Sequence, residues 1–169
     1  LTPTQVATFT PEAVAALPAE ALAQLLLNNA QLTGLTSEQV AALATAGKLG
    51  NLSPAQVATL PAATIDSVPP AVVAGLTDVQ VAALTDVQIK QLSTANIKAL
   101  TSDQAKALTQ VQLGALTSAQ VAAMDTVDLA QLNSAQIGAL SNLGVAGLTT
   151  TQVVNLATNQ VAALTADQL

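Results

Sequence analysis

An eight-residue period runs through the chain and limits what it can fold into. In the second half of the 169 residues every eighth residue is apolar and nearly always leucine. This column contains Leu76, Leu84, Leu92, Leu100, Leu108, Leu116, Met124, Leu132, Leu140, Leu148, Leu156 and Leu164. With the leucine as position one, the unit reads L-[T/S]-x-x-Q-[V/I]-x-A. Self-similarity at a fixed short period predicts a repeat architecture, in which each unit buries its apolar face against neighbouring units.

The same frame continues through the first half of the chain, with two interruptions. Its leucine column there contains Leu1, Phe9, Leu17, Leu27, Leu35, Leu43, Leu52, Leu60 and Val68. The spacing grows by two residues near 25–27 and by one residue within 44–51. We therefore predict a single repeat array over residues 1–169, with insertions near 25–27 and 44–51.

Position six is a second apolar column, filled mostly by Val and Ile as in Val81 and Ile89. A continuous α-helix does not bring the two columns to one face, because eight residues advance a side chain by about 800°, or about 80° beyond whole turns. A continuous strand also fails, since positions one and six have opposite parity and point to opposite faces. Each octad must therefore contain a turn.

Hydroxyl and glutamine residues indicate where a helix begins in each octad. Position two is mostly Thr or Ser and position five mostly Gln, the spacing of the capping box, in which a hydroxyl and an amide satisfy backbone groups at a helix start. The pattern recurs in frame from Thr36, Ser53, Thr101, Thr117 and Thr149. Pro3, Pro11 and Pro54 directly follow the capping residue, where the missing amide hydrogen costs nothing.

Charged residues agree with helices that begin at this place. Six acids occupy positions three or four, the first turn, and three lysines occupy position seven, the last turn. These residues are Glu12, Glu20, Glu38, Asp78, Asp86 and Asp103, and Lys90, Lys98 and Lys106. Both placements are favourable in the field of the helix dipole, although Asp66 at position seven is not. We predict a helix about 9 Å long over positions three to eight of each unit.

The predicted fold is all-α, a solenoid or superhelix of very short capped helices, one per octad. One octad buries too little apolar surface to offset the entropy of ordering eight residues, so stability must come from stacking. The alternative is a β-solenoid with strands of Val, Ile and Thr and with side-chain rows of Gln and Thr. The abundance of Ala, Leu and Gln, the caps and the charges favour helices.

Composition excludes several classes of function. Four lysines, no arginine and a net charge of −6 argue against nucleic-acid binding. The chain has no cysteine and no histidine, so disulfides, thiolate chemistry and the commonest metal ligand are absent. No window is apolar enough for a membrane span, because residues 13–27 are interrupted by Pro18, Glu20 and Gln24. We predict no enzymatic activity, no catalytic, cofactor-binding or metal-binding residues, and no cofactor.

Three features of the sequence are candidates for a catalytic or binding site. Asp125 and Asp128 are the closest acids, but positions two and five make them a variant of the capping box. Lys90, Lys98 and Lys106 form one column in the octad frame, for which one interpretation is a site for an anion or an acidic partner; the favoured interpretation is a solvated face with dipole stabilisation. The glycine-flanked segment 44–50 is either a bend or a binding loop.

Two families resemble parts of this pattern. Leu1-Thr2-Pro3-Thr4-Gln5-Val6 resembles the opening helix of the repeats in TAL effectors, DNA-binding proteins of plant pathogens, but their second helix and base-reading loop do not follow here. The whole chain, as in Leu76-Thr77-Asp78-Val79-Gln80-Val81-Ala82-Ala83, is similar to LTxxQ[V/I]xAL arrays in large bacterial secreted or surface proteins. This second resemblance implies an extracellular structural, adhesive or spacer role.

The functional prediction is therefore a non-enzymatic structural protein of the cell exterior or cell surface, forming a rod, a spacer or a self-assembling filament. Expected partners are further copies, head-to-tail or lateral, and a cell-surface or matrix component. Because the chain starts at Leu1 and stops within a unit at Leu169, we expect a processed protein or an excised piece. The alternative is a binding or adhesion module that presents a groove to a peptide or glycan.

Overall fold

The computed structural model describes residues 2–18 and 29–169. The described residues form short helices throughout and no strand, so the prediction of an all-α repeat fold is confirmed. The α-helices are α1 (Pro3–Ala7), α2 (Pro11–Ala16), α4 (Asn29–Leu32), α5 (Ser37–Thr45), α6 (Pro54–Thr59), α7 (Ala62–Ile65), α8 (Pro70–Ala74), α9 (Asp78–Ala82), α10 (Asp86–Gln91), α11 (Thr94–Lys98), α12 (Ser102–Ala107), α13 (Gln110–Ala115), α14 (Ser118–Ala123), α15 (Thr126–Gln131), α16 (Ser134–Gly138), α17 (Asn142–Ala146), α18 (Thr150–Val154) and α19 (Thr158–Val161). A 3-10 helix, η1, spans Leu49–Asn51.

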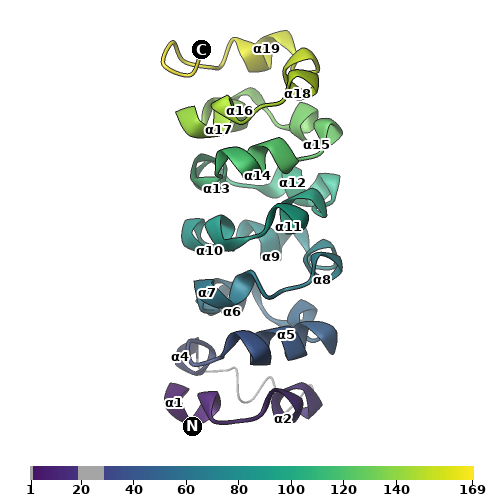
Figure 1. Cartoon of the computed structure of the whole chain (residues 1–169), viewed down its shortest axis with the longest axis vertical. Coiled ribbons are helices and arrows are strands. Elements are labelled where there is room, and N and C mark those ends of the chain that lie inside the picture. Colours follow the sequence, from purple (N-terminus) through teal and green to yellow (C-terminus); the bar gives the residue numbers. More distant parts are fainter. Residues whose placement is uncertain (1, 19–28) are drawn as a thin grey trace.

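The helices are stacked in layers along the long axis of the molecule, with α1 and α2 at one end and α18 and α19 at the other (Figure 1). In the regular part each helix packs on the helix three places later, as α9 does on α12 and α10 on α13. Three octads, or 24 residues, therefore complete one layer. We name the resulting sides of the rod stack A (α6, α9, α12, α15, α18), stack B (α7, α10, α13, α16, α19) and stack C (α8, α11, α14, α17).

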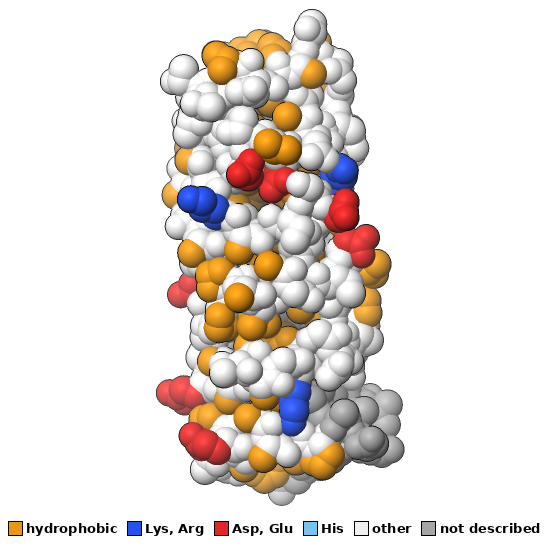
Figure 2. All heavy atoms as spheres, turned by 90° about the vertical axis from the view of Figure 1, so that its right-hand side faces the viewer, with side chains coloured by type: hydrophobic (Ala, Val, Ile, Leu, Met, Phe, Trp, Pro, Cys, Tyr) orange, Lys and Arg blue, Asp and Glu red, His pale blue; other side chains and the backbone are white. Residues whose placement is uncertain are grey.

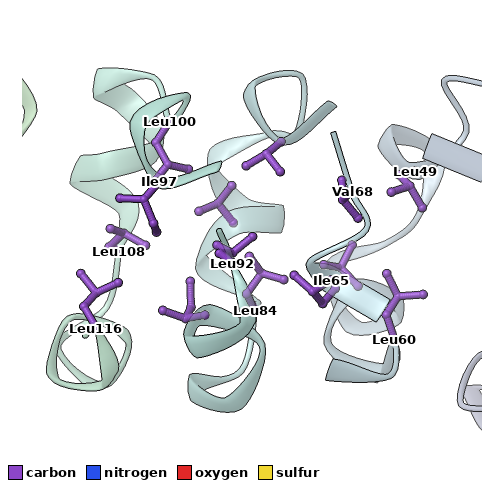
Figure 3. Close-up of a cluster of buried hydrophobic side chains, with 14 of the residues drawn as sticks. Leu49, Leu60, Ile65, Val68, Leu84, Leu92, Ile97, Leu100, Leu108 and Leu116 are labelled. Carbon is purple, nitrogen blue, oxygen red and sulfur yellow. The ribbon is translucent and has the colours of Figure 1, made fainter. Parts of the chain in front are cut away.

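Positions one and six fill the axis of this rod. Val81, Ile89 and Leu113 at position six are 0% exposed, and Leu84 and Leu108 at position one are also buried. Figure 3 shows these two columns pointing from successive helices into the common interior. The prediction that both columns share the buried face is confirmed. Because each layer contributes only aliphatic side chains, the core is thin and continuous along the axis instead of gathering around aromatic rings.

The predicted capping boxes form as expected. At α13 the hydroxyl of Thr109 accepts a hydrogen bond from the backbone N–H of Gln112 at 3.2 Å, and Oε1 of Gln112 accepts one from the backbone N–H of Thr109 at 2.8 Å. The same reciprocal pair opens α1, α5, α6, α9, α10, α12, α14, α16 and α18. Position one supplies the bend: Leu116, with φ −60° and ψ 138°, leaves the helical conformation directly before the next cap.

Glycine at two positions allows backbones of adjacent layers to approach. A Cβ atom on Gly147 would lie 2.3 Å from the carbonyl oxygen of Ser118, and one on Gly138 would lie 2.8 Å from that of Ala163. Real Cβ atoms do not come so close to backbone oxygens. At these two positions the absence of a side chain is therefore a packing requirement between layers.

The irregular segment 44–51 contains the end of α5, a turn and the 3-10 helix η1. α5 is about one turn longer than its neighbours, and two residues after its last residue, Thr45, comes Gly47, whose φ of 70° is the left-handed conformation that glycine tolerates best. The backbone N–H of Lys48 then bonds the carbonyl of Leu43 at 2.9 Å, which closes the helix end in a Schellman turn. Of the two interpretations of this segment, the bend describes what is observed.

Candidate functional site

A recurring polar feature of the described residues is a set of mostly buried amide side chains at position five, distributed over all three stacks. We name these residues the glutamine column. Its members, each donating from Nε2 to a carbonyl of the layer below, are Gln39, Gln80, Gln88, Gln104, Gln112, Gln120, Gln136, Gln152, Gln160 and Gln168.

Gln112 illustrates the bonding. While its Oε1 caps the start of α13, its Nε2 donates to the carbonyls of Val81, Ala82 and Leu84 at 2.9, 3.2 and 2.7 Å. These carbonyls lie at the end of α9 and in the link to α10, the helix on which α13 packs. The last carbonyls of a helix have no partner within the helix, so the amide satisfies groups that would otherwise be buried and unpaired. One side chain, 2% exposed, thus joins a helix start to a helix end.

The separation along the chain between donor and acceptor is constant in the regular part of the array. Gln88, Gln112 and Gln152 each reach carbonyls 28 and 31 residues upstream. One layer accounts for 24 residues of each separation. The other four or seven residues are the distance from position five back to position one of the same unit or to position six of the preceding unit. The column therefore follows the screw of the rod and connects every stack to the layer beneath it.

The separations change across the two irregular segments. Gln39 reaches the carbonyls of Val6 and Phe9, which lie 33 and 30 residues upstream, two more than in the regular part. The expected insertion near 25–27 lies outside the described residues. Gln39 nevertheless bonds to carbonyls at positions six and one, as the glutamines of the regular part do.

Lys48 takes the place of glutamine in the unit that contains η1. Counting back eight residues from the unit of Leu52 puts Lys48 at position five, and its Nζ donates to the carbonyl of Ala15 at 2.5 Å and to that of Leu17. An ammonium group there meets the negative end of α2, where a cation is favourable. Sequence reasoning missed this role, although the position of Lys48 in the frame was available.

Several units carry residues at position five that do not donate as glutamine does, among them the units of α15 and α17. Asp128 occupies position five of the α15 unit, is buried, and its Oδ1 accepts a hydrogen bond from the hydroxyl of Ser102 at 2.5 Å. Asp125 caps α15 by accepting from the backbone N–H of Val127 at 2.9 Å, but the predicted capping-box pairing with Asp128 is wrong, because the carboxylate of Asp128 bonds to Ser102 instead. Gly144 occupies position five of the α17 unit and has no side chain to offer.

The lysine column of the alignment is not a column in space. Lys90, Lys98 and Lys106 lie at the ends of α10, α11 and α12, which belong to stacks B, C and A. With three octads per layer, successive units face different sides, so the three lysines form no cationic line; their exposure agrees with the favoured interpretation of a solvated face. The lysines visible in Figure 2 lie well apart. Lys106 Nζ is 3.9 Å from Asp103 Oδ1 in an exposed pair.

The remaining hollows are shallow or closed. A surface hollow of about 620 Å³ lies between α9 and α12 and is lined by Asp78, Thr101, Asp103 and Lys106 among others. An apolar cavity of about 20 Å³ lies in the core beside Leu60, Ile65 and Val73. Within residues 2–18 and 29–169 no group of three acids is placed to hold a metal ion, and no helix has the length and apolar character to cross a membrane.

Comparison with known families agrees with the repeat. The model of the ALTTAQ repeat matches residues 87–118, 111–142 and 121–158. The chain is a tandem-repeat protein. The first two matches start 24 residues apart, which is one layer of the rod, and residues 115–120 read ALTSAQ, close to the letters that name the family. No curated protein matches the chain at a significant level.

Proposed function

We propose that this chain is a non-enzymatic structural protein that serves as a stiff rod or spacer. The observation that carries the proposal is the recurrence of the bonds of the glutamine column between layers along the rod, from Gln39 to Gln168. Bending the rod would break buried hydrogen bonds and separate aliphatic side chains on one side. Each such loss costs on the order of 1–3 kcal/mol for an unpaired buried group. Stiffness along the axis is the mechanical property that this bonding supports.

We propose that the protein acts at the cell exterior or cell surface. Its proposed partners are a cell-surface or matrix component and further copies of the chain, which associate head-to-tail or laterally. The absence of cysteine and the similarity to arrays in bacterial secreted or surface proteins support this location. Antibodies against the purified chain should label intact cells of the producing organism. Labelling that requires permeabilised cells would contradict the location without affecting the proposed stiffness.

Small-angle X-ray scattering tests the rod. Duplicating residues 100–123, which form one complete layer of α12, α13 and α14, should lengthen the molecule by one layer. The maximum dimension should grow by the same increment for one and for two added layers, while the radius of gyration of the cross-section stays constant. An increase in cross-section, or an unchanged maximum dimension, would count against a rod.

A binding or adhesion module is the second candidate, favoured by the hollow on stack A. Asp78, Asp103 and Lys106 give it a varied, charged lining, as expected of a site for a peptide or glycan. Calorimetric titration with panels of glycans and cationic peptides tests this candidate. Binding that is lost in the Asp103→Ala, Lys106→Ala double variant, and retained when the exposed Glu38 is replaced instead, would support it.

A further inference from the structure

The three stacks are not equally well packed where α6, α7 and α8 meet the layer below them. On this lower side α6 packs on α4 and α7 packs on α5, but among the described elements α8 has no packing partner of similar extent. By the order of the units, the element beneath α8 is the 3-10 helix η1, which has only three residues. Stack C is therefore thin between η1 and α8, whereas above α8 it continues through α11, α14 and α17.

A surface hollow of about 250 Å³ lies at this thin place. Its lining combines small residues from the end of α5 and from η1 with residues of α8 and its end. These residues are Ala44, Gly47, Gly50, Ala71, Val72 and Gly75. A Cβ atom on Gly50 would meet no atom within 4 Å. Figure 2 shows apolar side chains gathered at the level of α8, on the face that α8 occupies in Figure 1. The two walls of the hollow therefore carry no bulky side chain that holds them apart.

The core beneath the hollow is also incompletely filled. The apolar cavity of about 20 Å³ is lined by Leu49 of η1 and by Val73 of α8, together with residues of the layers above. Close packing of side chains normally opposes movement between layers, because a gap loses dispersion contacts on both of its sides. Free volume both inside and outside the rod removes part of this resistance between η1 and α8.

The hydrogen bond that joins layers elsewhere is missing on this side. Position five of the α8 unit is Val72, which has no amide to donate. The octad frame places the carbonyl of Leu43 where a glutamine there would donate, and that carbonyl already accepts the backbone N–H of Lys48 at 2.9 Å. Gln120, two layers higher in the same stack, donates to the carbonyls of Ile89 and Leu92 at 2.8 and 2.7 Å. Between η1 and α8 the sequence thus supplies neither the donor nor a free acceptor.

Stack B connects the same two layers firmly. α7 packs on α5, and the hydroxyl of Ser67 donates to the carbonyl of Ser37 at 3.1 Å. The hydroxyl of Ser37 in turn donates to the carbonyl of Ala63 at 3.5 Å. One side of this interface is therefore tied by contacts and hydrogen bonds, while the side of stack C has free volume.

We propose that the rod has a directional joint between η1 and α8, at which stack B is the hinge and the hollow on stack C closes. Closing the hollow buries its small apolar residues, which favours the bent shape, whereas the packing of α7 on α5 is kept in both shapes. The rod then exists in a straight and a bent shape, and a load or a bound partner shifts the balance between them. The joint goes beyond the proposed rod, because it gives one position along a stiff molecule the freedom to bend in one direction.

Distances between pairs of spin labels, measured by electron paramagnetic resonance, test the joint on the complete 169-residue chain, which has no cysteine of its own. The Ala46→Cys, Ala95→Cys variant carries labels on the two sides of the joint. The matched control, Ala71→Cys with Ala119→Cys, carries them along α8, α11 and α14, which pack directly on one another. All four alanines are exposed, and each pair spans two layers. We expect the first pair to give a broader distance distribution that extends to shorter distances, because its labels lie on the side that closes.

Filling the hollow should lock the joint. Gly50→Leu places a side chain in open space between the two walls, and Ala71→Leu does the same from the opposite wall. Either change should narrow the distribution of the pair at residues 46 and 95 and remove its shorter distances. Ala122→Leu, at the position of the α14 unit that corresponds to Gly50 and also exposed, should leave this distribution as it was. Circular dichroism shows whether each variant keeps its helices.

Each other outcome overturns the joint. Two equally narrow distributions would mean that the layers on either side of η1 do not move relative to each other. A broad distribution that persists in both the Gly50→Leu and the Ala71→Leu variants would mean that the motion does not close the hollow. Two equally broad distributions would mean that the whole rod is flexible, which contradicts the proposed stiffness as well. A narrow joint pair, with scattering that still shows a rod, leaves the proposed function standing, so the two failures are distinguishable.

Discussion

At the scale of single residues, stability depends on side chains that serve two helices at once. Gln112 caps its own helix through Oε1 and satisfies the end of another through Nε2, so its contribution cannot be assigned to either helix alone. The half of this role that lies within three residues is readable from the sequence, because Thr and Gln recur at capping spacing. The other half joins residues 28 and 31 apart, and that distance depends on the number of octads per layer.

Replacing Gln112 by Met keeps the volume of the side chain and removes its hydrogen bonds. The carbonyls of Val81 and Leu84 would then be buried without this donor, so we expect a loss of about 2–4 kcal/mol in the free energy of unfolding. Denaturant unfolding followed by circular dichroism measures it. The control is Gln5→Met, at the same position in an exposed layer, where losing the local cap costs about 1 kcal/mol or less. Equal losses in the two variants would contradict an interlayer role.

Gly147 and Gly75 provide a second matched pair. Both end a helix of stack C in nearly the same conformation, with φ of −82° and −86°. A Cβ on Gly147 meets the carbonyl of Ser118 at 2.3 Å, whereas the nearest atom to one on Gly75 is 3.4 Å away. We expect Gly147→Ala to lower the melting temperature, with a cost of about 1–3 kcal/mol, and Gly75→Ala to change stability by under about 1 kcal/mol. Similar melting curves for both variants would show that the close approach relaxes freely.

At the scale of the helix, the sequence predicts well where each helix begins, but it does not predict which other helices each one packs against. The capping Thr or Ser, the following acid and the buried positions all follow from local spacing, and the structure confirms them at α9, α10 and α12. What each helix faces cannot be derived in this way, because the same octad fits a layer of any number of units. Lys90 and Lys98, for example, share position seven of the octad, although α10 and α11 face different sides.

The helix α17 offers a test of how much one missing amide weakens an element. Gly144 stands at position five, and the octad frame places the carbonyls of Leu113 and Leu116 where a glutamine there would donate. Gly144→Gln should therefore stabilise the protein by about 1–2 kcal/mol, combining higher helix propensity with new hydrogen bonds. The Cβ has room, since its nearest neighbour is the flexible hydroxyl of Ser141 at 3.3 Å.

Gly144→Ala separates these two contributions. Alanine provides the gain in helix propensity, about 1 kcal/mol, but no donor. Thermal unfolding of the three proteins should rank Gln above Ala above Gly. A glutamine variant no more stable than the alanine variant would mean that the amide does not reach the carbonyls of the layer below.

At the scale of the whole molecule, the rod is a screw whose step is one octad. Each unit occupies nearly the same surroundings as the next, apart from a rotation to another stack. Among the described helices the main contacts reach one layer up and one layer down, as α12 packs on α9 and on α15. Stability is then close to a sum over units and their interfaces, and the fold tolerates changes in length that keep the step.

Deleting one complete octad, residues 76–83, should consequently preserve the fold. α10 and all later helices move to a different stack relative to the first layers, yet they find equivalent leucine and carbonyl partners there. Helical circular dichroism per residue should stay the same, and the melting temperature should fall modestly because one interface is lost. Deleting residues 80–83 alone should be far more damaging, since four residues remove a cap and place every later glutamine out of step with its carbonyls. If deleting four residues proved as harmless as deleting eight, the octad would not hold the layers in register. Neither the glutamine column nor the axial core would then explain the stability of this protein.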